Sequence, residues 1–216
     1  PNQKKFMNQK KIFLKREGDR YYERNKNIIS QNHNFICKKI IELSKSKSKL
    51  RILEIGCGAG NLLKKIHEKK KNFKLFGIDP SIKAIKANKN LNISLKKGTA
   101  DALPYKDKSF DLVIYGFCLY LVDKELLFKV VHEANRVIKL KGNVAIFDFY
   151  SKKSILKNYR HNRLIKSHKM DFSKLFLSHP FYKLIYRKIG DHKNIQRKSK
   201  STKNTVSFFI IKKDAK

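Results

Sequence analysis

Three glycines alternate directly after an apolar run, in the segment Leu53-Glu54-Ile55-Gly56-Cys57-Gly58-Ala59-Gly60. A strand that ends this way must turn sharply and let another group approach its backbone, because glycine tolerates positive φ and carries no Cβ. Apolar residues at helical spacing follow at Leu62, Leu63 and Ile66, so a helix N-terminus is expected beside the turn. This unit is typical of nucleotide sites, and a tight turn without a ligand is the simpler alternative.

Strand and helix patterns alternate over the middle of the chain. Apolar runs predict strands at 50–55, 74–79, 93–98, 110–115 and 144–149, and helical spacing predicts helices at 34–43, 61–69, 81–88 and 124–137. Two late strands are expected at 182–186 and 206–211, with a very polar connection between them that we interpret as a mobile hairpin. The order predicts an α/β fold with a parallel sheet that helices cover on both faces.

Acidic residues stand at the ends of successive predicted strands. Asp79 can accept hydrogen bonds from two ribose hydroxyls, and Asp101 can accept one from an adenine amine. Each has a simpler interpretation alone, as a helix cap and as a loop residue. Glu54, just before the glycines, suits a cofactor with a cationic amino-acid end better than a pyrophosphate. Neither the G-x-G-x-x-G spacing nor a P-loop G-K-[ST] is present, so the combined pattern favours a cofactor with a cationic amino-acid end over NAD or ATP.

These motifs together resemble the class I S-adenosylmethionine-dependent methyltransferases, especially small-molecule enzymes with a methyltransferase-11-like core. Within residues 50–149, the matching segments are 53–60, 77–81, 98–104, 109–113 and 133–139. The resemblance implies a Rossmann-like, doubly wound, mostly parallel seven-stranded sheet in a three-layer α/β/α arrangement, with an antiparallel C-terminal strand pair. It implies S-adenosylmethionine as the cofactor. Lys139-Leu140-Lys141-Gly142 departs from the family's K-P-G-G, which puts the local turn geometry in doubt.

The resemblance also implies roles for residues, position by position. Gly56, Gly58 and the Cys57 backbone would pack against the methionine part of the cofactor, Glu54 would lie near its ammonium, and Asp79 would bind the ribose. The full set of implied cofactor-binding residues is Glu54, Gly56, Cys57, Gly58, Asp79, Pro80, Ser81, Asp101, Ala102, Tyr115 and Gly116.

The adenine and the methyl donor would be held by the later strand ends. Pro80 or Ser81 would flank the adenine, and Asp101 and Ala102 would read its edge. Residues 115–116, at the end of the fourth strand, would face the methyl-donor region.

Two further elements resemble a subgroup of the family. Glu17–Asn25 matches E-G-D-x-(W/Y/F)-(F/Y)-x-R-N, and Ser167–Lys174 matches S-(Y/H)-K-M-D-(Y/F)-S-K. Tyr21, Tyr22 and Arg24 are predicted to form a lid over the donor site, with a helix of packed aromatic residues as the alternative.

The chain is predicted to form one domain. Residues 1–49 are an N-terminal helical lid or cap, and 50–216 are the methyltransferase domain, with basic C-terminal strands within 182–212. Pro1 stands where a start methionine would be, so the sequence leaves open whether the N-terminus is complete.

No spacing selects a catalytic base. The candidates are His168, Asp171, Tyr150 and Tyr120, and a histidine in so basic a stretch is commonly a solvated surface residue. A methyl transfer needs no base when the acceptor is already nucleophilic, because the cofactor carries the activation.

The charge of the chain is unusual. Its 52 lysines and arginines outnumber 17 acidic residues, for a formal charge of +35, and residues 151–216 contain 19 of the basic residues against three aspartates. A basic face would attract nucleic acid or anionic membranes. Overuse of lysine with Ile, Asn, Phe and Tyr is the alternative, since all of these have A/T-rich codons.

Few sequence features support a membrane protein, a metal-dependent enzyme or an enzyme that modifies nucleic-acid bases. No apolar run is long enough to span a bilayer, and the three cysteines are scattered, so we expect a soluble, cytoplasmic protein. No metal-ligand spacing is present, and neither a [DNS]-P-P-[YFW] run nor a Pro-Cys pair points to nucleic-acid bases. The leading hypothesis is a small-molecule methyltransferase, for instance acting on a sugar or nucleotide-sugar intermediate of surface polysaccharide. An RNA methyltransferase and a non-catalytic scaffold with the cofactor-binding fold are the alternatives. The oligomeric state of the protein stays open.

Overall fold

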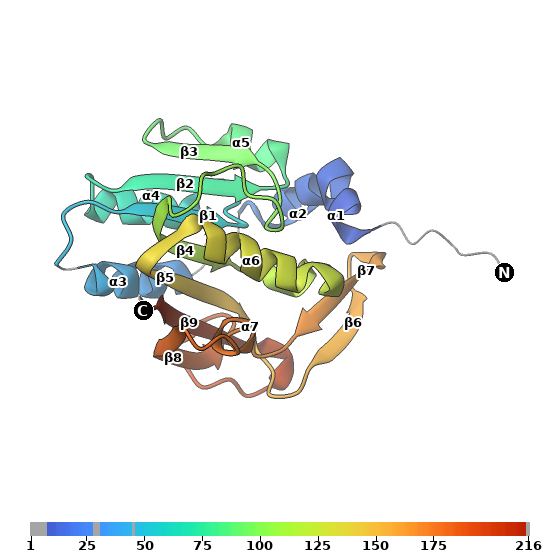
Figure 1. The fold of residues 1–216 in the computed structure, drawn as a ribbon. Helices are drawn as coiled ribbons and strands as arrows, with labels where there is room; N and C mark the ends of the chain where they lie inside the picture. Colours follow the sequence, from blue (N-terminus) through green and yellow to red (C-terminus); the bar gives the residue numbers. More distant parts are fainter. Residues whose placement is uncertain (1–7, 28–30, 45, 215–216) are drawn as a thin grey trace.

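A seven-stranded sheet forms the centre of the molecule (Figure 1), in a computed structural model that describes residues 8–27, 31–44 and 46–214. The strand order is β3-β2-β1-β4-β5-β9-β8. The strands are β1 (Arg51–Ile55), β2 (Lys74–Asp79), β3 (Ile93–Lys97), β4 (Phe110–Gly116), β5 (Ile138–Phe149), β8 (Tyr182–Asp191) and β9 (Thr205–Lys213). Strands β1 to β5 pair in parallel, and β9 is antiparallel to both β5 and β8. The predicted fold class, including the antiparallel pair, is confirmed.

Helices cover both faces of this sheet because its central strands are apolar on both sides. Ile52 packs with α3 (Asn32–Leu43) and α4 (Asn61–Lys69), while its neighbour Leu53 belongs to the core under α6 (Leu127–Val137). Successive strand residues point to opposite faces, so one apolar run supplies both cores. The short α5 (Ile82–Ala87) follows β2.

The N-terminal helices lie against the carboxyl edge of the sheet. They are α1 (Gln9–Ile12), a π-helical turn η1 (Phe13–Glu17) and α2 (Gly18–Asn25). The backbone N–H groups of Gln9 and Lys10 donate to the Asp123 carboxylate, each at 3.1 Å. Gly18 allows the close approach of α2, since a Cβ there would lie 3.1 Å from the main chain of Pro80. Residues 1–7, 28–30 and 45 of the predicted lid segment lie outside the described residues.

A hairpin that the sequence did not predict stands beside the N-terminal helices. It consists of β6 (Ile155–Tyr159) and β7 (Asn162–Lys169), which form a separate two-stranded sheet. A short α7 (Lys174–Leu177) follows, and 3-10 turns occur at Leu119–Leu121, Lys124–Leu126 and Thr202–Asn204. The hairpin was missed because lysines, arginines and asparagines interrupt its apolar alternation.

The turn between α6 and the sheet also differs from prediction. Strand β5 begins at Ile138, six residues before the predicted start at 144, and includes the departing motif. Lys141 adopts a φ of 62°, in the left-handed region that favours glycine, where the family motif has glycine. The departure noted in the sequence is therefore a locally strained turn.

The described residues contain neither a membrane-spanning helix nor a cluster of metal ligands. None of their helices has the length and apolar character to cross a membrane. Within the same residues, no group of His, Cys, Asp and Glu side chains could hold a metal ion.

Candidate functional site

A large pocket opens at the carboxyl edge of the sheet. Its volume is about 1110 Å³, and its walls come from the ends of β1, β2, β4 and β5, the N-terminal helices, the β6–β7 hairpin and the connection between β8 and β9. Ligands of open α/β sheets bind at this edge. The volume slightly exceeds the usual range for a single small ligand, so a cofactor and an acceptor can share it.

The glycine turn forms the floor of the pocket. Gly56, Gly58 and Gly60 have φ values of 74°, 54° and 76°. A Cβ on Gly56 would lie 2.5 Å from the Cβ of Cys118, whereas a Cβ on Gly58 would meet no atom within 4 Å. Gly56 is therefore required by packing inside the protein, and Gly58 leaves a space open toward the pocket.

Glu54 is a buried carboxylate without an ion-pair partner in the part of the chain that the structure describes. Its Oε2 has no hydrogen-bond partner among these residues, and Glu54 lines the pocket. Burial, and then the nearby Asp79 charge, raise the pKa of Glu54 well above its usual value. Gly116 makes room for it, because a Cβ there would lie 2.6 Å from Glu54 Oε1. A cation bound here would relieve the unpaired carboxylate.

Asp79 is held in place by the backbone and faces the same pocket. Its Oδ2 accepts the Gly58 N–H at 2.9 Å, and its Oδ1 accepts the Ser81 N–H at 2.8 Å. Burial raises the pKa of Asp79 to about 6. Each oxygen keeps a further lone pair, so a fixed bidentate acceptor is available to a diol.

Asp101 lies further along the same edge, against the N-terminal helices. Lys10 Nζ donates to its Oδ2 at 2.7 Å. Burial alone would raise the pKa of Asp101, but hydrogen bonds from Lys10 and Thr99 outweigh burial and lower it. Lys10 was not among the predicted site residues, and its ion pair holds α1 against the loop that follows β3.

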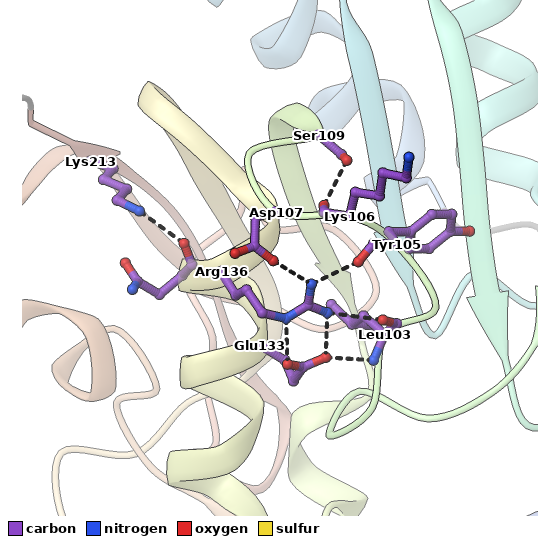
Figure 2. A network of polar contacts seen from close by, with 9 residues as sticks. Leu103, Tyr105, Lys106, Asp107, Ser109, Glu133, Arg136 and Lys213 are labelled. Atoms are coloured by element: carbon purple, nitrogen blue, oxygen red, sulfur yellow. Dashed lines mark hydrogen bonds and ion pairs between the residues drawn. The ribbon is translucent and has the colours of Figure 1, made fainter.

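The loop that carries Asp101 is fastened from outside by an arginine network (Figure 2). Arg136 makes a bidentate pair with Glu133, donates to the carbonyls of Leu103 and Tyr105, and bonds Asp107. Glu133 in turn accepts the Leu103 N–H at 2.7 Å. The motif matched at 133–139 therefore acts at a distance from the pocket, by holding the shape of the loop after β3.

The structure therefore offers a close fit to S-adenosylmethionine. The unpaired Glu54 carboxylate suits the cofactor's ammonium, the Asp79 carboxylate suits two ribose hydroxyls, and the open space over Gly58 suits close passage of the ligand. The Cys57 backbone and Pro80 also line the pocket, as predicted positions near the methionine and adenine ends.

Three of the predicted cofactor residues lie elsewhere or have other partners. Tyr115 is fully buried under α6 and its hydroxyl donates to the Val130 carbonyl at 3.1 Å, so its side chain does not face the donor. Ser81 caps α5, because its Oγ accepts the Ala84 N–H. Ala102 is exposed and does not line the pocket. Successive side chains of a strand point to opposite faces of the sheet, and the side chain of Tyr115 points toward α6.

Two of the three predicted lid residues line the pocket, and the third does not. Tyr21 and Tyr22 line the pocket, and the Tyr120 hydroxyl donates to the Tyr21 hydroxyl at 3.3 Å. Arg24 does not line it; its guanidinium donates to Glu17 at 2.6 Å and to Tyr159 at 3.3 Å. Arg24 thus ties α2 to the β6–β7 hairpin.

Of the four candidate bases, only Tyr120 lines the pocket. His168 is buried on the other side of β7, and Asp171 accepts hydrogen bonds from the Ser173 hydroxyl and N–H. Tyr150 is buried and its hydroxyl accepts a bond from Arg187. Burial raises the pKa of Tyr120 well above its usual value, so this phenol stays protonated.

Sequence reasoning missed the residues of the opposite wall. Aromatic rings come from Phe117, Phe149 and His192, and a row of basic side chains comes from the hairpin and the β8–β9 connection. Of these residues only Lys169 lies in a segment that the sequence analysis matched, Ser167–Lys174, and that match did not place it in the pocket. The wall forms through the pairing of distant strands.

Comparisons with known proteins agree with this site. Residues 52–142 match a family model described as a methyltransferase domain. The demethylmenaquinone methyltransferase of Lactobacillus johnsonii is 30% identical over 184 residues, which are 80% of this chain and 70% of that protein. The corresponding enzyme of Staphylococcus aureus is 31% identical over 59% of this chain and 55% of its own length. The chain thus spans about half the length of some curated relatives, such as the Thermotoga maritima enzyme, of which it covers 48%.

Solved structures share the fold. A Burkholderia thailandensis 1,6-didemethyltoxoflavin-N1-methyltransferase, solved with its substrate and S-adenosylhomocysteine, has a TM-score of 0.74 at 10% identity, over 95% of this chain and 89% of that one. The Pyrococcus horikoshii protein PH0226 has a TM-score of 0.64 at 18% identity, over 91% of this chain and 99% of that one. With the sequence matches and the glycine turn between Glu54 and Asp79, these likenesses lead to one conclusion: the chain belongs to the class I S-adenosylmethionine-dependent methyltransferases.

Proposed function

We propose that this protein transfers a methyl group from S-adenosylmethionine to a small-molecule acceptor. The observation that carries the proposal is the unpaired, buried Glu54 carboxylate beside the backbone-held Asp79 and the open space over Gly58. A scaffold without a ligand would leave Glu54 buried and unpaired at a cost in free energy and no gain, which argues against the non-catalytic alternative.

The proposed chemistry asks the protein for alignment and exclusion of water. S-adenosylmethionine supplies, when bound, a methyl group on a sulfonium that a nucleophile displaces in line. Glu54 and Asp79 would fix the two ends of the donor, while Tyr21, Tyr22 and Phe117 close the pocket around the acceptor. Alignment of this kind provides much of the rate in such reactions.

A proton released by the acceptor needs a base in the pocket. Tyr120 is unsuited, because its raised pKa keeps it protonated. Burial lowers the pKa of His192, so its imidazole is neutral near pH 7 and able to accept a proton. We therefore propose His192 as the catalytic base, in place of the four candidates predicted from the sequence.

The acceptor is the least constrained part of the proposal. The sugar or nucleotide-sugar acceptor stays a prediction, supported by no contact in the pocket. Several relatives are named demethylmenaquinone methyltransferases, and a structural neighbour acts on 1,6-didemethyltoxoflavin, which favours a small molecule for this chain as well. The RNA alternative rests on the charge of +35 alone. The free cysteines Cys37 and Cys57 favour a reducing compartment such as the cytoplasm.

A donor assay tests the proposal. Labelled S-adenosylmethionine is incubated with separate metabolite and RNA pools, with wild-type protein and Asp79→Ala, and S-adenosylhomocysteine binding is measured by calorimetry. We expect donor-dependent methylation of the metabolite pool that Asp79→Ala abolishes. Absence of any S-adenosylhomocysteine binding would overturn the enzyme function, and label in RNA only would establish the RNA alternative.

A further inference from the structure

The far wall of the pocket comes from a part of the sheet separate from the cofactor residues. Strand β5 is separated from β2 by β1 and β4. Phe149 ends β5 and pairs with Val206, and Asp191 pairs with Thr205, so the connection 192–204 lies beside the carboxyl end of β5. The β6–β7 hairpin follows β5 directly in the chain and joins the same wall.

Aromatic rings cover this wall. The ring centroids of Phe117 and Phe149 are 4.7 Å apart, and His192 stacks on Phe149 at 5.4 Å with an interplanar angle of 25°. Phe117 has a φ of 59°, which is a strained value for a residue other than glycine. Its backbone N–H donates to the Phe147 carbonyl at 2.8 Å. Backbone strain of this kind is common at ligand-binding sites, and Phe117 lines the pocket.

The rim of the same wall is cationic. Lys157 and Arg160 come from the hairpin, Lys169 from β7, and Lys193 and Lys203 from the connection before β9. The described hairpin and 192–204 connection contribute no acidic residue to the pocket lining. The acidic lining residues belong instead to the proposed cofactor side or to the α1 contact, where Lys10 and Lys26 also line the pocket. Acids and bases are therefore mixed at that end, whereas the hairpin and the connection contribute bases without acids.

Lys169 joins the rings to the rim. Its Nζ lies 3.8 Å from the centroid of the Phe149 ring and donates to the Lys203 carbonyl. No acidic side chain forms an ion pair with Lys169 among the described residues. An ammonium that is half-buried, unpaired by acid and still carrying free donors attracts an anion.

We propose that this wall binds a planar aromatic acceptor that carries a carboxylate or another anionic group, with the ring against Phe117, Phe149 and His192 and the anion on Lys169. This inference rests on the proposed methyltransferase function and names its substrate class. A cationic acceptor fits poorly, although aromatic clusters often bind cations, because the Lys169 ammonium already lies over Phe149.

The test uses three matched probes on the full chain with saturating S-adenosylhomocysteine: 2-naphthoate, its neutral amide 2-naphthamide, and the cation 2-naphthylmethylammonium. Glucose 1-phosphate serves as an anion without an aromatic ring. Calorimetry should show 2-naphthoate binding at least about 10-fold more tightly than either other naphthalene probe and than glucose 1-phosphate, since a charge-assisted hydrogen bond has about that effect.

Substitutions of single lysines test whether Lys169 causes this difference in affinity. Lys169→Gln should weaken 2-naphthoate about 10-fold, and Lys169→Arg should restore most of it. Lys153→Gln, which removes one exposed positive charge outside the pocket lining, is the matched control and should leave binding unchanged.

The outcomes separate the inference from the proposed function. Equal binding of 2-naphthoate and 2-naphthamide, or tighter binding of glucose 1-phosphate, by a protein that binds S-adenosylhomocysteine overturns the inference alone. Equal loss in Lys169→Gln and Lys153→Gln also overturns it, because the effect would then be general charge. Failure to bind S-adenosylhomocysteine overturns the proposed function instead.

Discussion

The two ends of the pocket differ in how they are built and in their charge. The proposed cofactor end is formed by backbone turns and two acids at strand ends, the buried Glu54 and the backbone-held Asp79. The proposed acceptor end is formed by rings and lysines from a hairpin and a long connection. A donor common to a whole family needs one geometry, whereas acceptors vary, and loops vary more readily than strand ends.

Loss of the Asp79 carboxylate should have the largest effect on the cofactor end. In Asp79→Ala, two ribose hydrogen bonds to an ionised group disappear, so S-adenosylhomocysteine should bind about 100-fold more weakly in calorimetry. Asp107→Ala, which removes an exposed carboxylate of the Arg136 network, is the control. Similar affinities for Asp79→Ala and wild type would refute the assigned role.

Binding of S-adenosylhomocysteine should change the protonation of the Glu54 carboxyl group. Burial raises the pKa of Glu54 and so favours the protonated carboxyl in the free protein, whereas a bound ammonium would favour the ionised form. Calorimetry in buffers of different ionisation enthalpy should therefore show proton release when S-adenosylhomocysteine binds, with about 10-fold weaker binding and no release from this site in Glu54→Gln. Proton release that persists in Glu54→Gln would assign the proton elsewhere.

The affinity for S-adenosylhomocysteine should depend on pH through the titration of Asp79 and Glu54. Asp79 has a pKa of about 6, raised by burial, so it is ionised above that pH and protonated below it. Ribose hydroxyls bind best to the ionised form, so titration of Asp79 by itself should lower S-adenosylhomocysteine affinity about 10-fold between pH 7.5 and pH 5.0, and protonation of Glu54 should add to this fall. Asp79→Asn should remove the Asp79 share of the fall, and an affinity that rises toward low pH would contradict the assignment.

The smallest effect should come from the arginine network of Figure 2. Arg136→Ala removes the bonds that hold the loop after β3, so the free energy of unfolding should fall by about 2 kcal/mol in urea titrations. Donor affinity should fall only a few-fold, because Asp101 loses its support without losing its carboxylate. A loss equal to that of Asp79→Ala would show that the loop, rather than the strand ends, governs donor binding.

The sequence predicted what local patterns determine. The glycine turn and the acids Glu54 and Asp79 follow apolar strands, so their place at the sheet edge follows from topology. Tyr115 was misplaced because strand alternation sends its side chain under α6. Lys169 lies in the matched segment Ser167–Lys174, but its place in the pocket depends on β6–β7 pairing. His192 belongs to no matched segment, and its place depends on the register of β9 with β5 and β8.

The division of the pocket is tested most directly by two variants measured with two ligands. Dissociation constants for S-adenosylhomocysteine, and for 2-naphthoate at saturating S-adenosylhomocysteine, are determined by calorimetry for Asp79→Asn and Lys169→Gln. We predict that Asp79→Asn weakens S-adenosylhomocysteine at least about 10-fold more than 2-naphthoate, and that Lys169→Gln shows the reverse preference. Equal weakening of both ligands by either variant would contradict a pocket with separate cofactor and acceptor ends.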